Sequence, residues 1–176
     1  QLLSIYGETL SILRHRGHDF DAILPAVPRL KERIIREIAD WPVRPEVFDS
    51  DQNDELFAQA DAALIASGTV SLELALHNVP HVSGYRFDAI TSQFLGLLKT
   101  WSANLPNLIA DNVIIPEEIN GMVMPERMAR HLEPLLGDST ERRRQLEGFE
   151  KVREAMKTER PTGELAAEII FDHMKR

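Results

Sequence analysis

The hydrophobic positions in the first half of the chain alternate between helical and extended spacing. Residues 2–16 carry apolar side chains every three or four positions, which predicts an amphipathic helix that ends near Gly17. The apolar run at 21–27 has the length of a strand. We expect that strand to end at Pro25, because proline cannot donate to a strand ladder.

The same alternation continues toward the middle of the chain. Three further elements are expected: a helix at 29–39, a short strand at 47–48 and a short helix capped by Asn53 or Asp54. Residues 61–66 (DAALIA) form the clearest buried strand, and 81–85 form another. Strands separated by helices indicate βαβ units and a parallel sheet, whose strands are apolar throughout when both faces are covered.

The segment after DAALIA is ambiguous. Val70, Leu72, Leu74 and Leu76 alternate strictly, which by itself predicts a strand. We predict a helix instead, because a second strand there would need a tight hairpin, and parallel strands are joined by longer crossovers. In that helix Val70, Leu74 and Ala75 should face inward.

The second half of the chain is predominantly helical. Pro116 and Pro125 each occupy a position typical of a first helical turn, and helices at 125–136 and 139–157 should break at Gly137. Thr162 can cap a last helix, whose inward residues would be Leu165, Ala166, Ile169 and Ile170. We therefore expect one α/β domain over 1–176, a Rossmann-like parallel sheet flanked by helices, with a helical C-terminal region at about 125–176.

Composition excludes several classes of function. The 176 residues include 20 Lys+Arg and 28 Asp+Glu, a formal net charge of −8, which argues against a nucleic-acid partner because such a partner needs a basic face. The chain has no cysteine, so disulfide scaffolds, zinc ribbons and thiol nucleophiles are excluded. No apolar run reaches the roughly 18 residues that span a bilayer, and no signal peptide is evident.

The first residues suggest a larger parent protein. The chain starts at Gln1, without methionine, and already within a helical pattern. We expect a piece of a longer protein that lacks part of its machinery and could expose a sheet edge.

One segment carries candidate chemistry. Ser67, Gly68 and Thr69 follow a buried strand directly and precede the predicted helix, whose free N–H groups and dipole favour an anion. Glu73 lies one turn further on the same face, where a carboxylate could accept hydrogen bonds from a ribose diol. The pattern predicts a nucleotide half-site; the alternative is a plain turn with a helix cap and a solvated glutamate.

At this point the sequence resembles a known family. The matching segments, in matching order, are 61–69, 72–76 (LELAL), 80–86 (PHVSGYR) and 105–110 (LPNLIA). They are similar to the C-terminal, donor-binding region of the lipid-A-disaccharide synthases, which are GT-B-type glycosyltransferases. The likeness extends from the first helix to the last.

The resemblance implies an inverting hexosyltransferase of lipid A biosynthesis in Gram-negative bacteria. The family transfers 2,3-diacylglucosamine from its UDP derivative to 2,3-diacylglucosamine 1-phosphate, without a metal or other cofactor. The expected partners are these donor and acceptor sugars and the N-terminal domain of the same protein, in the cytoplasm. Peripheral contact with the inner membrane and a homodimer stay open.

The resemblance also assigns residues. Ser67, Gly68 and Thr69 are expected at the diphosphate and Glu73 at the ribose. Asn107 matches the asparagine of the family's LPN motif and is expected in the substrate site. Tyr85 and Arg86 should shape the cleft, and no catalytic residue is expected in this domain, so the chain alone should be inactive.

Two departures from the family pattern affect the phosphate contacts. The family's Gly-Ser-Arg loop, which precedes the first helix of this domain, has no counterpart here. Many relatives carry a Gly-Arg pair after LPNLIA, where this chain has Asp111 and Asn112, so one possible partner for a phosphate is missing.

Other interpretations remain. Another GT-B enzyme, such as a UDP-N-acetylglucosamine 2-epimerase, would share the fold, and a non-catalytic nucleotide-binding or assembly module would need no chemistry. The apolar residues of 94–101 could contact acyl chains or a membrane, or form a core or interdomain helix. His77 and His81 flank Pro80 and should fall on different elements, which disfavours a metal site.

Overall fold

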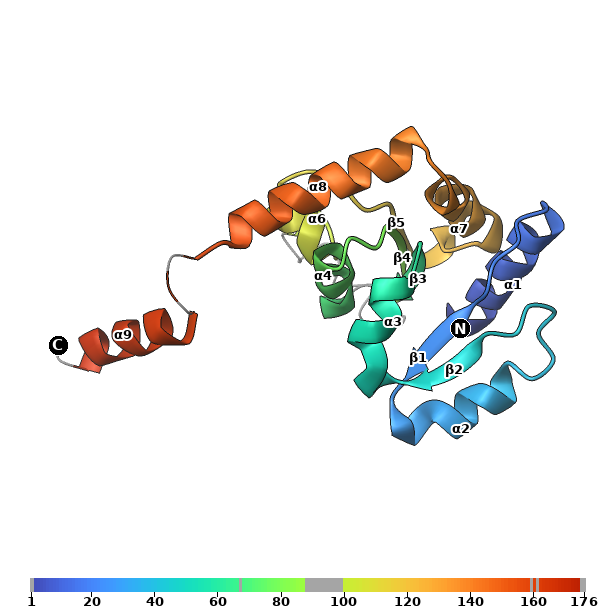
Figure 1. Cartoon of the computed structure of the whole chain (residues 1–176), viewed down its shortest axis with the longest axis horizontal. Helices are drawn as coiled ribbons and strands as arrows, with labels where there is room; N and C mark the ends of the chain where they lie inside the picture. Colours follow the sequence, from blue (N-terminus) through green and yellow to red (C-terminus); the bar gives the residue numbers. More distant parts are fainter. Residues whose placement is uncertain (1, 67, 88–99, 159, 161, 175–176) are drawn as a thin grey trace.

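The computed structural model describes residues 2–66, 68–87, 100–158, 160 and 162–174. Helices and strands alternate through the first half, and the last third is helical (Figure 1). The elements are α1 (Leu2–His15), β1 (Ile23–Ala26), α2 (Pro28–Glu37), β2 (Glu46–Asp49), η1 (Ser50–Gln52), α3 (Asn53–Gln59), β3 (Ala63–Ala66), α4 (Thr69–Leu76), β4 (His81–Tyr85), α6 (Leu105–Ile109), β5 (Glu117–Ile119), η3 (Asn120–Met122), α7 (Pro125–Leu132), η4 (Glu133–Leu136), α8 (Thr140–Met156) and α9 (Thr162–Met174).

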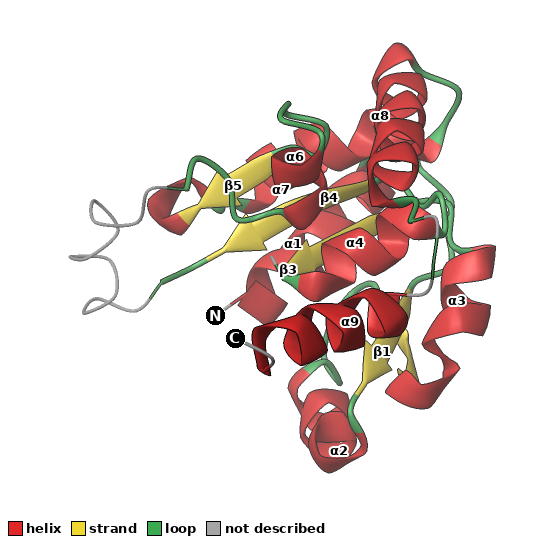
Figure 2. Ribbon diagram, turned by 90° about the vertical axis from the view of Figure 1, so that its left-hand side faces the viewer, coloured by secondary structure: helices red, strands yellow, loops and turns green. Residues whose placement is uncertain are grey.

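All strand pairs in the described residues are parallel. β1 pairs with β2, and β4 lies between β3 and β5 in a second sheet. The register places Ala66 opposite Gly84 and Tyr85 opposite Ile119. The carboxyl ends of β3, β4 and β5 therefore meet at one edge (Figure 2). The predicted fold class, a parallel sheet flanked by helices, is confirmed.

Helices cover both faces of the β3–β4–β5 sheet. On one face, α1 and α7 pack around Val82 in a cluster that includes Leu13 and Met128. On the other face α4, α6 and α8 pack together, and Ala75 of α4 contacts Phe149 of α8. The sheet is thus the middle of three layers, and its central strand β4 is the most buried strand.

The ambiguous segment at 69–76 is a helix, as predicted over the alternating pattern. Leu74 and Ala75 face inward as expected, but Val70 is exposed, and Ser71 is buried in its place. Ser71 is tolerated there because its hydroxyl donates to the carbonyl of Gly68 at 2.7 Å.

Several local predictions were wrong. Pro25 lies inside β1, opposite Phe48. Within the described residues β1 pairs with β2 alone, so it is an edge strand, where a proline without an N–H is tolerated. DAALIA is less buried than β4, since only Ile65 in β3 is buried. Pro116 precedes strand β5 and not a helix. Neither Asn53 nor Asp54 caps α3, because η1 runs directly into it.

The C-terminal helices were predicted correctly in extent but not in packing. α7 starts at Pro125, and the helical region breaks at Gly137 before α8. The last helix, α9, begins at Thr162 itself. It lies apart from the body of the molecule (Figure 1). Its apolar residues Ile169 and Ile170 are therefore exposed and not inward-facing. Among the described residues, no helix is long and apolar enough to cross a membrane.

Candidate functional site

The carboxyl edge of the β3–β4–β5 sheet gathers most of the residues singled out in the sequence. β3 ends at Ala66, and Gly68 and Thr69 follow it within three residues. β4 ends at Tyr85 and leads into Arg86. Since β3 and β4 are parallel neighbours, these two segments leave the sheet side by side. Open α/β sheets bind ligands at this edge.

Gly68 has a backbone that residues with a side chain rarely adopt. Its φ is 148° and its ψ is −158°, and a Cβ built on it would meet no atom of the described residues within 4 Å. The space in front of the turn is therefore open to a ligand. Behind the turn, the Gly68 carbonyl accepts from the backbone N–H of Ser71 at 3.2 Å and from its hydroxyl. Ser67 lies outside the described residues.

Helix α4 begins at Thr69, where the sequence predicts an anion site. The first N–H groups of an α-helix have no partner within the helix, so those of Thr69 and Val70 lack an intrahelical acceptor. The helix dipole adds a partial positive charge at the same place. Glu73 is exposed one turn later, and its carboxylate makes no ion pair or hydrogen bond with the described residues. It is free to accept hydrogen bonds from a ligand.

Tyr85 and Arg86 lie at the end of β4. The Tyr85 ring is half-buried and lies 4.4 Å from the Phe87 ring, centroid to centroid. Arg86 is exposed, and one of its guanidinium nitrogens donates to the carbonyl of Val123 at 3.0 Å. This bond ties Arg86 to the segment that follows β5.

Asn107 lies in a different setting from the one expected. It is 0% exposed. Its side-chain carbonyl accepts from the backbone N–H groups of Ile114 (2.9 Å) and Ile115 (2.8 Å), and its amide donates to the Ile115 carbonyl and the Ser102 hydroxyl. All its hydrogen-bonding groups are used within the chain, where they close the loop around α6.

Sequence reasoning missed the polar residues around that loop. The Glu117 carboxylate accepts from the side-chain amide of Asn104 at 2.7 Å and from the backbone N–H of Ala103 at 3.1 Å. The side-chain carbonyl of Asn104 and the hydroxyl of Ser83 are buried and have no partner within the described part of the chain. The only available signal was the cluster of polar residues just before LPN.

Among the described residues, no group of three or more His, Cys, Asp or Glu side chains is placed to hold a metal ion. His77 and His81 fall on different elements, as predicted. His77 lies 3.3 Å from Asp54, whereas His81 is buried against Phe149, and burial lowers the pKa of His81 to about 4.

Comparisons with known proteins identify the family. A family model described as lipid-A-disaccharide synthetase matches residues 2–170. The chain belongs to this family.

Curated relatives carry the same name. A lipid-A-disaccharide synthase of Rhodopseudomonas palustris (strain HaA2) is 36% identical over 180 residues, covering 99% of this chain and 45% of the relative. One of Nitrobacter hamburgensis is 37% identical over 175 residues, covering 98% of this chain and 44% of the relative. The chain thus spans about 45% of the length of such relatives.

Membership in the lipid-A-disaccharide synthetase family confirms the predicted resemblance. Asp111 is the residue that follows LPNLIA. Asp111 has a φ of 47°, a left-handed conformation that glycine adopts freely and aspartate tolerates.

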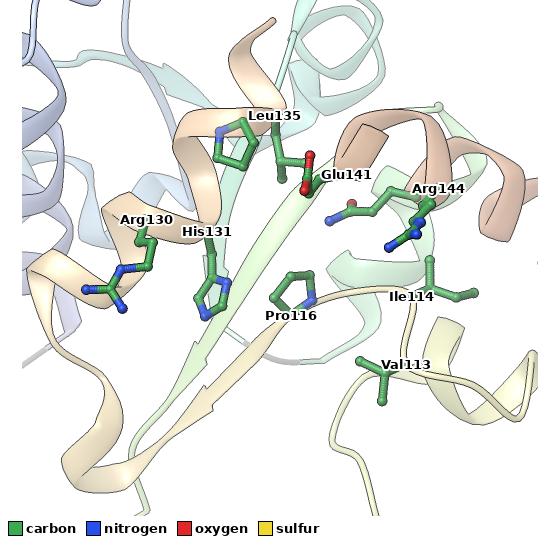
Figure 3. Close-up of a pocket in the computed structure, with 10 residues that line it drawn as sticks. Val113, Ile114, Pro116, Arg130, His131, Leu135, Glu141 and Arg144 are labelled. Carbon is green, nitrogen blue, oxygen red and sulfur yellow. The ribbon is translucent and has the colours of Figure 1, made fainter. Parts of the chain in front are cut away.

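A pocket of about 360 Å³ lies away from the candidate nucleotide site, between α7, η4 and α8 (Figure 3). Pro116, which precedes β5, is part of its wall, so it opens at the amino edge of the sheet. His131 in its lining bonds to the buried carboxylate of Glu118 at 3.0 Å. None of the residues predicted for the nucleotide site lines this pocket.

Proposed function

We propose that this chain is the donor-binding part of a glycosyltransferase of lipid A biosynthesis. The reaction transfers 2,3-diacylglucosamine from UDP to 2,3-diacylglucosamine 1-phosphate and yields the disaccharide 1-phosphate and UDP. Family membership supports the reaction. The observation that carries the site is the open, glycine-only turn at Gly68, which leads directly into α4.

The donor's UDP would lie along the carboxyl edge of the sheet. Its diphosphate would accept hydrogen bonds from the backbone N–H groups of Thr69 and Val70 and from the Thr69 hydroxyl. Glu73 lies four residues beyond Thr69, or about 6 Å along the helix axis, a span suited to the ribose diol. Tyr85 and Arg86 would form the neighbouring wall.

The chemical step would be a direct displacement at the anomeric carbon. The acceptor hydroxyl attacks that carbon, the bond to the UDP oxygen breaks, and a base removes the hydroxyl proton. The N-terminus of α4 would stabilise the negative charge that develops on the departing diphosphate. The base would come from the rest of the protein, so the chain alone should bind UDP and form no disaccharide.

Thermal unfolding of the chain with UDP, UMP or buffer tests this proposal. UDP should stabilise the chain more than UMP does, because the second phosphate adds charge at the helix N-terminus. Replacing Glu73 with alanine should weaken UDP binding by about 1.5–3 kcal/mol through loss of charge-assisted hydrogen bonds. Glu147→Ala, at an exposed position on α8, is the matched control and should bind UDP normally.

A UDP response that survives Glu73→Ala would remove this residue from the site. The absence of any response in the unsubstituted chain would favour a module for assembly over a nucleotide site.

A further inference from the structure

Tyr6 connects helix α1 to both strands of the candidate donor site. Its hydroxyl lies 2.5 Å from the carbonyl oxygen of Ile65 and 3.3 Å from that of Gly84. Both carbonyls belong to the last rungs of the β3–β4 ladder, since Ala66 pairs with Gly84. Gly68 lies three residues beyond Ile65, and Arg86 lies two residues beyond Gly84.

Gly84 provides the space that this contact needs. A Cβ at this position would lie 3.0 Å from the Tyr6 hydroxyl, 3.1 Å from a methyl group of Val123 and 3.3 Å from the terminal methyl of Met128. The backbone of Gly84 is thus packed closely from the α1 and α7 side. A side chain at position 84 would crowd the Tyr6 hydroxyl against the strand carbonyls.

The hydroxyl remains a donor at every physiological pH. Burial raises the pKa of Tyr6 well above its ordinary value, because a charged phenolate would lose its hydration there. A carbonyl can only accept, so the tie to Ile65 and Gly84 depends on this proton.

We propose that Tyr6 is a positioning residue of the donor site, whose hydroxyl fixes the ends of β3 and β4 relative to each other. Those ends carry Gly68 and Arg86, so the distance between the phosphate turn and the neighbouring wall depends on Tyr6. The proposal rests on the proposed function for its ligand and on the described contacts for its geometry.

Thr9 offers a matched control on the same helix. It is 0% exposed, and its hydroxyl donates to the Ile5 carbonyl at 2.8 Å, within α1. Its second, longer contact is with the carbonyl of Pro125, at the start of α7. Thr9→Val removes a buried hydroxyl from α1, as Tyr6→Phe does, but leaves the strand ends untouched.

Amide hydrogen exchange of the ligand-free chain tests the geometry. In Tyr6→Phe, amide exchange should become faster in the peptide that contains Ala66 and Gly68 and in the peptide that contains Tyr85 and Arg86. A peptide around Phe149 serves as the internal reference and should exchange at an unchanged rate. Thr9→Val should not produce this local change. Equal exchange at the strand ends in the two variants would overturn the proposed tie.

UDP titration tests the link to the ligand. The dissociation constant for UDP should rise by roughly three- to tenfold in Tyr6→Phe, the scale of one lost hydrogen bond, and should not change in Thr9→Val. Unchanged affinity in Tyr6→Phe would overturn a role in positioning the donor site. If the unsubstituted chain binds no UDP, the proposed function fails, and the exchange result alone supports or overturns the tie between Tyr6 and the strands.

Discussion

At the residue scale, the candidate site depends most on the backbone of Gly68. The combination of φ 148° and ψ −158° is nearly exclusive to glycine. The sequence indicated a turn here, and a glycine between a strand and a helix was enough to predict it. The close approach of a ligand to this turn stays a prediction. The buried role of Asn107 could not be predicted, because its partners at 102 and 114–115 are set by the folded loop.

Replacing Gly68 with alanine should therefore be costly even though there is room for a methyl group. We expect a loss of about 1–3 kcal/mol in the free energy of unfolding, due to backbone strain, and a loss of UDP binding. Gly121→Ala is the control, because a Cβ there also meets open space but its φ is not in the strained region. Urea unfolding and UDP titration of both variants measure the difference; equal effects would show that strain at Gly68 is unimportant.

At the scale of elements, the buried side chain of Asn107 links the short helix α6 to residues 114 and 115. Asn107→Ala leaves the N–H groups of Ile114 and Ile115 without their acceptor. We expect the ligand-free chain to lose about 3 kcal/mol of unfolding free energy, since each buried unsatisfied group costs about 1–3 kcal/mol. Urea unfolding measures this loss, and the exposed neighbour Asn112→Ala should be nearly neutral.

If Asn107→Ala instead unfolds like the unsubstituted chain without ligand but loses UDP affinity, Asn107 acts through direct contact with the donor.

Strand β4 carries a pH-dependent contribution through His81. Burial against Phe149 lowers the pKa of His81 to about 4, from 6.5, so the unfolded chain binds a proton at a higher pH than the folded chain does. The stability is complete above about pH 6.5 and falls as the pH drops toward 4, by roughly 3 kcal/mol in total.

Urea unfolding between pH 7 and pH 4 checks this prediction. His81→Leu should flatten the decline relative to the unsubstituted chain, whereas His15→Gln, at an exposed position, should not. An identical pH dependence in His81→Leu would contradict the assignment to His81.

The elements predicted well are those whose stability comes from apolar periodicity. α1 falls in this class. α4 was predicted against its alternating pattern, because parallel strands are joined by crossovers and not by tight hairpins. Strand β5 was missed because its buried residue is Glu118, an unusual core residue. Glu118 is stabilised by Arg127 (2.8 Å) and His131 (3.0 Å), which come from α7 and cannot be paired with it from sequence.

At the scale of the whole molecule, the family membership and the candidate site both support a donor-binding part of a longer protein. The chain corresponds to about 45% of its relatives' length, and its parallel sheet presents Gly68, Thr69, Glu73 and Arg86 at one edge. A two-domain glycosyltransferase would close over this edge and exclude water. One wall alone leaves a bound donor largely hydrated, so the affinity of the isolated chain for UDP should be weak.

The central claim is that UDP binds at the carboxyl edge of the β3–β4–β5 sheet. The most direct measurement is an NMR titration of the ¹⁵N-labelled chain with UDP. The account predicts that amide shifts change at Gly68–Glu73 and at Tyr85 and Arg86, and stay constant around the pocket lined by Arg130, His131 and Arg144. Shifts confined to that pocket, or none at millimolar UDP, would contradict it.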